Sequence, residues 1–181
     1  MKTIAHIEIT PSEVVLNDKP LATASQGAEI LSELYRQHID DYPKFFKMDG
    51  LCRLGFVASE LLLNALGEQR FTERDDRAVV LFNSSGSHDA DIKYQATVSE
   101  FPSPSVFVYT LPNIITGEIA IRNKYMGETS FYLLEDYDTQ QMQHVLQTTF
   151  QDAGTTSILT GWIDYVDGTH FHARMEIIEK N

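Results

Sequence analysis

The chain has 181 residues, enough for one domain whose core needs neither a disulfide nor a metal to stabilise it. Its net charge of −12 repels nucleic acid and anionic membranes. The single cysteine excludes an intramolecular disulfide, and no stretch reaches the roughly 20 apolar residues that span a bilayer. The first residues lack the apolar run of a secretory signal, so we expect a soluble cytoplasmic protein.

The N-terminal segment begins with a strand pattern. Residues 4–10 form a β-rich run that ends at Pro11, and residues 14–16 are a candidate for a short additional strand. Apolar side chains then recur at helical spacing, which predicts a helix over residues 25–38 with Ser25 as its N-cap.

The clearest helix pattern lies between Asp49 and Gly67. Asp49 can cap its N-terminus, and Gly67 can end it in a left-handed conformation. Residues 69–77 read as a polar loop. Residues 78–82 form a continuous apolar run, the pattern of a strand buried on both faces, and residues 83–87 form a small-residue turn.

The rest of the chain continues the alternation of helix and strand patterns. The predicted elements are a helix over 89–98, an extended connector over 101–104, a helix over 113–125, a strand over 130–134, a helix capped by Asp138 or Thr139, and strands over 157–166 and 170–178. Asp167-Gly168 is a two-residue hairpin signal between the last two strands.

This order of elements predicts an α/β fold in one domain, residues 1–181. The expected architecture is a layered, mixed five-stranded sheet with helices on both faces and a C-terminal antiparallel hairpin.

Three segments together resemble the N-terminal half of the β-ketoacyl-acyl-carrier-protein synthases, which have a thiolase-like fold. Residues 46–55 contain the family's lysine-methionine-aspartate entry into a long helix, here Lys47-Met48-Asp49. Residues 78–86 are similar to its buried strand and glycine-containing turn. Residues 109–122, with Pro112-Asn113, are similar to its proline-asparagine helix start. The resemblance covers most of the chain.

The resemblance places the family's nucleophilic cysteine at Asp136. The family's two active-site histidines and last lysine belong to a C-terminal half that has no counterpart here. The resemblance therefore implies a stand-alone N-terminal half without condensing activity, and no cofactor or metal. The candidate site residues are Glu135, Asp136, Asp138 and Asn113.

Other chemistry has weaker signals. Asp136 or Asp138 can be a plain helix cap, or with Glu135 a carboxylate pair or cation site. Cys52 has the helical position of a small buried hydrophobe rather than of a nucleophile. His170 and His172 lie on one strand face, which suits an exposed sheet face better than a metal site. Residues 83–89 lack the glycine-x-serine-x-glycine pattern of serine hydrolases.

The resemblance also suggests partners. In the family, the strand corresponding to residues 130–134 pairs with its copy across a two-fold axis, so we expect a homodimer or a heterodimer with a full-length ketosynthase. Acyl carrier protein is a further candidate partner, although the acidic charge disfavours a purely electrostatic contact. A chain without the second half would dimerise, bind a partner or carry polar residues on the uncovered face. The glutamines at positions 140, 141, 143 and 147 suggest the last of these.

Three functions remain open at this point. The first is a non-catalytic accessory subunit in a fatty-acid or polyketide-type pathway. The second is an acyltransferase-type enzyme of altered chemistry that uses Asp136 or Cys52. The third is a small module that binds acyl chains or lipids.

Overall fold

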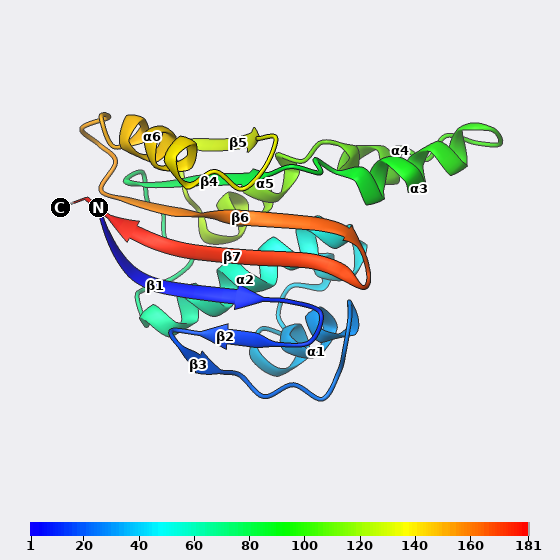
Figure 1. Ribbon diagram of the computed structural model, residues 1–181, viewed down its shortest axis with the longest axis horizontal. Coiled ribbons are helices and arrows are strands. Elements are labelled where there is room, and N and C mark those ends of the chain that lie inside the picture. The colour runs from blue at the N-terminus through cyan, green and yellow to red at the C-terminus, as the bar shows by residue number, and fades with distance from the viewer. Residues whose placement is uncertain (181) are drawn as a thin grey trace.

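One mixed sheet forms the centre of the computed structural model, which describes residues 1–180. Within these residues the sheet has seven strands in the order β3-β2-β1-β7-β6-β4-β5 (Figure 1). The strands are β1 Lys2–Ile9, β2 Val14–Leu16, β3 Lys19–Pro20, β4 Arg77–Asn83, β5 Thr129–Leu133, β6 Ser157–Asp167 and β7 His170–Glu179. β4 is parallel to β5 and β6, whereas β7 is antiparallel to β6 and β1. The expected mixed sheet and C-terminal hairpin are confirmed.

The expected number of five strands is wrong. β1 pairs with β2, and β2 pairs with the two-residue strand β3. Asn17 and Asp18 both have positive φ, at 49° and 62°, the conformation of tight hairpin turns. Pro20 fits at the outer edge because proline offers no amide for a further strand. The structure confirms the strand predicted over residues 14–16, whereas β3 was missed because two residues give no periodic signal.

Helices cover both faces of the sheet, as the sequence predicts. The helices and 3-10 turns are α1 Glu29–His38, η1 Pro43–Lys47, α2 Gly50–Leu66, α3 His88–Val98, α4 Pro104–Phe107, η2 Val108–Thr110, α5 Ile114–Asn123 and α6 Thr139–Thr149. α1, α2 and α5 pack against one face, and α6 packs against the other (Figure 1). None of the helices in residues 1–180 is both long and apolar enough to cross a bilayer.

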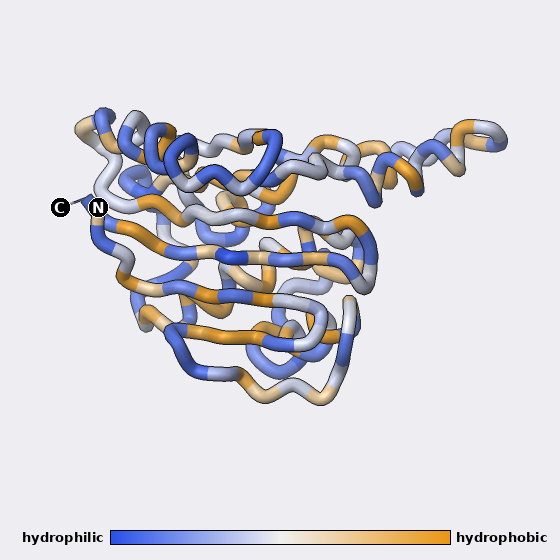
Figure 2. Tube along the Cα trace, in the orientation of Figure 1, coloured by the Kyte–Doolittle hydropathy of each residue, from blue (hydrophilic) through white to orange (hydrophobic). Residues whose placement is uncertain are grey.

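Alternation along the strands separates the two faces. In β1, Ala5, Ile7 and Ile9 are buried against the α2 side, whereas His6 and Glu8 point to the opposite face. β7 follows the same rule, with buried Phe171, Ala173 and Met175 each between polar residues, up to Ile177. Figure 2 shows this as orange and blue alternating along both strands. The core therefore lies mainly between the sheet and α2.

Helix ends follow local chemistry, with one correction. Asp49 caps α2 by accepting a hydrogen bond from the amide of Cys52 at 3.0 Å, and Gly67 ends the helix at φ 66°. α1, in contrast, begins at Glu29 instead of Ser25. The Glu33 carboxylate accepts the amides of Ala24 and Ser25, so those residues wrap outside the helix.

An arm projects past the end of the sheet. It consists of α3, α4 and η2, and Figure 1 shows it extending away from the other elements. Only Ala90 of α3 is buried. The arm carries exposed apolar side chains, namely Ile92, Val98, Phe101, Phe107 and Val108. The predicted connector is extended only as far as Ser103, because Pro104 opens the short helix α4.

Candidate functional site

The loop after β4 is fastened to the neighbouring strand. It contains Ser84 and Ser85, and the Asp164 carboxylate on β6 accepts hydrogen bonds from the amides of both serines, at 3.2 and 3.0 Å. Asp164 also accepts from the Ser85 hydroxyl at 2.6 Å and from the Trp162 indole at 2.7 Å. The Asn83 side chain closes the turn through Gly86. The small-residue turn is thus held in place, and the amides of Ser84 and Ser85 already donate to a carboxylate of the same chain, that of Asp164.

The loop between β5 and α6 carries three of the four predicted site residues. Leu134 anchors it by donating its amide to the Asn83 carbonyl at 2.9 Å. Asp138 is the N-cap of α6 and accepts from the amides of Gln140 and Gln141, at 2.8 and 3.1 Å. The Gln141 amide, with further donors, holds the pKa of Asp138 below its usual range. Asp138 therefore has a capping role, one of the two alternatives left open by the sequence.

Glu135 and Asp136 are exposed in that loop, and neither makes a hydrogen bond or ion pair within residues 1–180. Asn113 is exposed at the N-terminus of α5, and its side chain does not cap the helix. No hydrogen bond among the described residues joins Asn113 to the β5–α6 loop. The structure thus brings Glu135, Asp136 and Asp138 together at the carboxyl end of β5 and gives Asn113 no shared contact with them.

Cys52 lies inside α2, away from that loop. Its side chain is 2% exposed, and burial, together with the nearby Asp49 carboxylate, raises the pKa of the thiol well above its usual value. A buried thiol with a raised pKa forms little thiolate at neutral pH. This environment suits the role of a small core residue.

The histidines of β7 contact carboxylates. The His172 ring contacts Glu8 at 2.7 Å, and His170 contacts Asp167 at 3.0 Å. Across residues 1–180, no group of three or more histidine, cysteine, aspartate or glutamate side chains is arranged to hold a metal ion.

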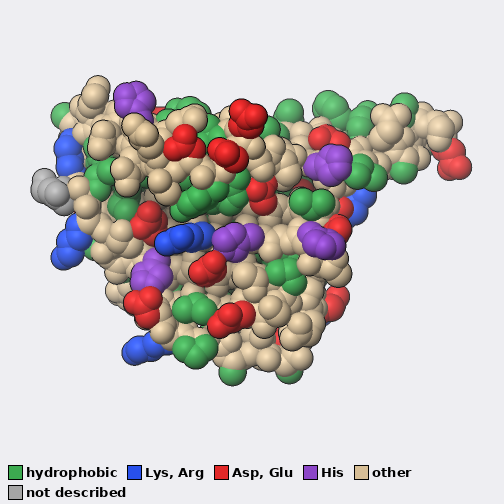
Figure 3. Space-filling view, viewed as in Figure 1, with side chains coloured by type: hydrophobic (Ala, Val, Ile, Leu, Met, Phe, Trp, Pro, Cys, Tyr) green, Lys and Arg blue, Asp and Glu red, His purple; other side chains and the backbone are tan. Residues whose placement is uncertain are grey.

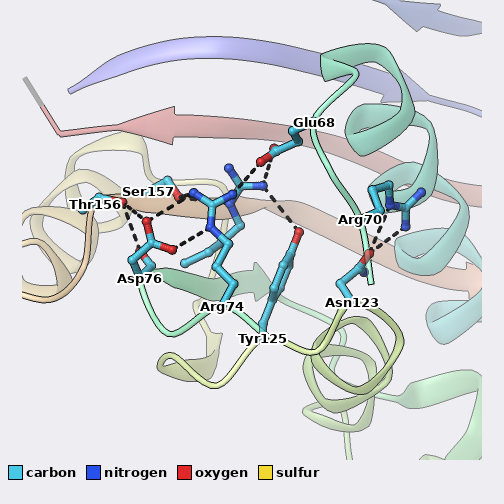
Figure 4. Close-up of polar contacts among 9 residues, drawn as sticks. Glu68, Arg70, Arg74, Asp76, Asn123, Tyr125, Thr156 and Ser157 are labelled. Atoms are coloured by element: carbon cyan, nitrogen blue, oxygen red, sulfur yellow. Dashed lines mark hydrogen bonds and ion pairs between the residues drawn. The ribbon is translucent and has the colours of Figure 1, made fainter. Parts of the chain in front are cut away.

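A network of charged side chains, of which Arg77 is buried and the others are partly exposed, connects the loop before β4 to the sheet. Glu68 forms ion pairs with Arg74 at 2.5 Å and with Arg77 at 2.6 Å, and Arg77 is only 1% exposed (Figure 4). Arg74 also pairs with Asp76 at 2.6 Å, and Arg77 donates to the Ser157 hydroxyl at 3.0 Å. The prediction that residues 69–77 form a polar loop missed this network. A dense run of alternating charge between two apolar segments was the available signal.

β5 forms one edge of the sheet among the described residues. Exposed apolar side chains lie on it and beside it: Leu133 of β5 is 58% exposed, and nearby Met126 and Ile121 are 71% and 69% exposed. Met126 and Ile121 line a groove of about 570 Å³ with Gly127 and Thr129. We call β5 and these three side chains the β5 edge. It combines an unpaired strand edge with apolar surface, a combination that soluble proteins rarely leave exposed.

The arrangement of the sheet and helices is that of the thiolase-like fold, in the form found in ketosynthases and chain length factors. A ketosynthase in complex with its chain length factor from Xenorhabdus doucetiae gives a TM-score of 0.67 at 16% identity, and the match covers 99% of this chain and 79% of that one. The ishigamide ketosynthase/chain length factor gives a TM-score of 0.70 at 14% identity, over 98% of this chain and 61% of that one.

A third solved structure is a type II polyketide synthase acyl-carrier protein in complex with its ketosynthase bound to the hexaketide. It gives a TM-score of 0.60 at 11% identity, over 98% of this chain. The present chain spans 61% and 62% of the last two structures' chains. A scan against protein-family models and a search of curated proteins found no match. TM-scores of 0.60 to 0.70 establish a shared fold, whereas identities of 11 to 16% do not establish shared chemistry.

Proposed function

We propose that this chain is a non-catalytic, ketosynthase-like accessory subunit of a fatty-acid or polyketide-type pathway. It pairs through the β5 edge with a second chain of the same fold, either its own copy or a full-length ketosynthase. The observation that carries this proposal is the β5 edge itself, an unpaired strand flanked by exposed Ile121, Met126 and Leu133.

The chemistry of the edge supports pairing. An edge strand presents a row of amide and carbonyl groups, and a second strand can satisfy them by extending the sheet. Proteins that avoid such pairing place proline or lysine on the edge strand. β5 has the sequence Thr-Ser-Phe-Tyr-Leu and contains neither. The exposed apolar side chains would be buried in the same contact, which adds a hydrophobic driving force.

The similar structures support a partner of this kind. Two of them contain a ketosynthase with a chain length factor, and the third contains a ketosynthase with an acyl-carrier protein. A ketosynthase is therefore the first heteromeric partner to test, and acyl carrier protein is the second.

The environment of the predicted nucleophile position supports the absence of catalysis. A thiol at a helix N-terminus is activated by the helix dipole and attacks a thioester. At the start of α6 the chain instead has the exposed carboxylates of Glu135 and Asp136, followed by Asp138 as cap. A carboxylate is a poor nucleophile toward a thioester, and Cys52, the one thiol of the chain, is buried in α2.

The test is sedimentation equilibrium of the chain alone and mixed with a ketosynthase from the same host. We expect a dimer in at least one case. Leu133→Lys should weaken it, because lysine places a charge in the apolar contact. Val166→Lys is the matched control, since Val166 is 45% exposed on β6, which is not an edge strand. A monomer in both samples contradicts the proposal. Thioester turnover that is lost in Asp136→Ala supports the altered acyltransferase instead.

One observation favours the acyl-binding module as a second candidate. A pocket of about 560 Å³ lies between the arm and the start of α2, lined by Met48, Ala90, Val106 and Tyr109 with Lys47 and Lys93. Its apolar walls suit an acyl chain, and Lys47 can pair with an anionic end, whereas Lys93 is already ion-paired with Asp89 at 2.6 Å and the Asp49 carboxylate also lines the pocket. Native mass spectrometry of the purified chain tests this, and a bound acyl species that is lost in Val106→Asp supports it.

A further inference from the structure

The second face of the sheet is only partly covered. α6 packs over β4 and β6 through Met142, Leu146 and Phe150. Over β1 and β7 the exposed positions are polar: Glu8 on β1 and Arg174 on β7 lie directly opposite each other in the register. Figure 3 shows charged and histidine side chains gathered across this region. A strand whose one face is polar is adapted to water on that face. The region is therefore suited to a polar ligand rather than to a further apolar layer of protein.

A groove of about 420 Å³ crosses this polar region. Tyr137, just before α6, and Met142, on α6, line one side, and Val15 on β2 and Asp18 in the β2–β3 turn line the other. Arg174 lies between them on β7. The volume falls within the range of about 300 to 1,000 Å³ that is usual for small-molecule sites.

Each carboxylate of the groove already has a hydrogen-bonding partner. The Glu8 carboxylate contacts the His172 ring at 2.7 Å, and Asp18 contacts the His6 ring at 3.1 Å. The Glu176 carboxylate accepts from the Thr3 hydroxyl at 2.7 Å.

Arg174 differs from these groups. Within residues 1–180 its guanidinium makes neither a hydrogen bond nor an ion pair, although Glu8 faces it across the strands. A guanidinium presents a planar fork of donors that matches a carboxylate in two parallel hydrogen bonds. The groove thus offers one unpaired cation whose geometry selects a planar anion.

The other side chains that line the groove determine which further features of a ligand fit. Tyr137 is 45% exposed, and its ring packs edge-on against Trp162 at 5.4 Å, so it is held as an aromatic wall. Met142 adds an adaptable apolar surface from α6. The acidic groups Glu8, Asp18 and Glu176 repel a dianion such as a phosphate monoester more strongly than a monoanion, and Arg174 repels a metal cation.

We propose that this groove is a binding site for a small monocarboxylate with an apolar body, with the carboxylate on Arg174 and the body against Tyr137 and Met142. The site lies on the face of β1 and β7, whereas the β5 edge lies at the far end of the sheet. Binding here is therefore independent of the proposed pairing, and the two can fail separately.

The test is amide NMR of the full chain titrated with hexanoate and 3-phenylpropionate. We expect saturable shifts at residues 6–8, 160–162 and 174–176, with a dissociation constant of about 1 mM or tighter. Hexanamide, the neutral analogue of hexanoate, should produce none of these shifts. R174Q should weaken binding by at least about tenfold, since it removes a charge-assisted pair. R36Q on α1 is the matched control, because Arg36 is an exposed arginine outside the groove, and it should bind as the unmodified chain does.

Three results would overturn the proposal: no shifts at these residues, equal shifts with hexanamide, or unchanged affinity in R174Q. Should R174Q fail to fold, Y137A provides the decisive measurement, because Tyr137 lies at the surface. Y137A should weaken 3-phenylpropionate more than hexanoate. Equal effects on the two ligands, or no effect on either, would count against the site.

Discussion

The Asp164 carboxylate and Ser85 are joined twice, through the serine amide at 3.0 Å and the serine hydroxyl at 2.6 Å. The two residues lie 79 positions apart in the chain. This contact fixes the turn after β4 against β6. It also helps to position the β5–α6 loop, because the Leu134 amide in that loop donates a hydrogen bond to the Asn83 carbonyl.

Replacing that carboxylate should loosen the turn. Asp164→Ala removes the acceptor for four donor groups of Ser84 and Ser85 and for the Trp162 indole. We expect a loss of about 2 to 4 kcal/mol in the free energy of unfolding, measured by urea denaturation, because hydrogen bonds to charged groups are worth about 1.5 to 3 kcal/mol. The exposed Asp75, changed to alanine, is the control, and its effect should stay below about 0.5 kcal/mol. Similar losses in the two variants would contradict this account.

Removing the shared anion of the arginine network should also destabilise the fold. Glu68→Gln leaves the guanidiniums of Arg74 and Arg77 without their common partner, and Arg77 is buried. Because Glu68 is partly exposed, we expect a loss of about 1 to 3 kcal/mol, between the values for exposed and buried ion pairs. Glu73→Gln, in the same loop but exposed, serves for comparison. If thermal or urea unfolding cannot tell the two variants apart, the network contributes little.

The stability of the protein should fall in acid partly through Asp76. Its hydrogen bond with Arg74 lowers the pKa of Asp76 to about 2. Because the folded pKa lies below the unfolded value of about 3.9, the stabilisation is fully present above that value and is lost as the pH falls toward 2. We expect Asp76→Asn to remove up to about 2 kcal/mol of this pH dependence, measured by urea unfolding between pH 5 and pH 2. Asp75→Asn should keep the slope of the unmodified protein.

Cys52 should be unreactive in the folded protein. Burial raises the pKa of its thiol well above the usual value, so both access and thiolate are lacking. We expect negligible labelling by a disulfide reagent at pH 8 and complete labelling in urea. Rapid labelling of the native chain would reopen the acyltransferase alternative that uses this thiol.

Local chemistry in the sequence determined much of the fold. Asp49, Gly67 and Asp138 act as the helix ends that their residue types predict, because a cap depends on amides only two or three residues away. The period-two pattern of β7 likewise determined which side chains face the core. The segments that resemble ketosynthases led to the thiolase-like fold that the solved structures show.

Tertiary structure alone decided the rest. Glu33 draws the amides of Ala24 and Ser25 away from α1, and Asp164 holds a turn 79 residues earlier in the chain. The unpaired Arg174 depends on which carboxylates across the sheet have taken other donors. These outcomes depend on the partners that packing brings within hydrogen-bond distance, and no local spacing encodes that distance. The sequence therefore determined the elements and their buried faces, whereas packing decided which charges are neutralised and which remain available to a ligand.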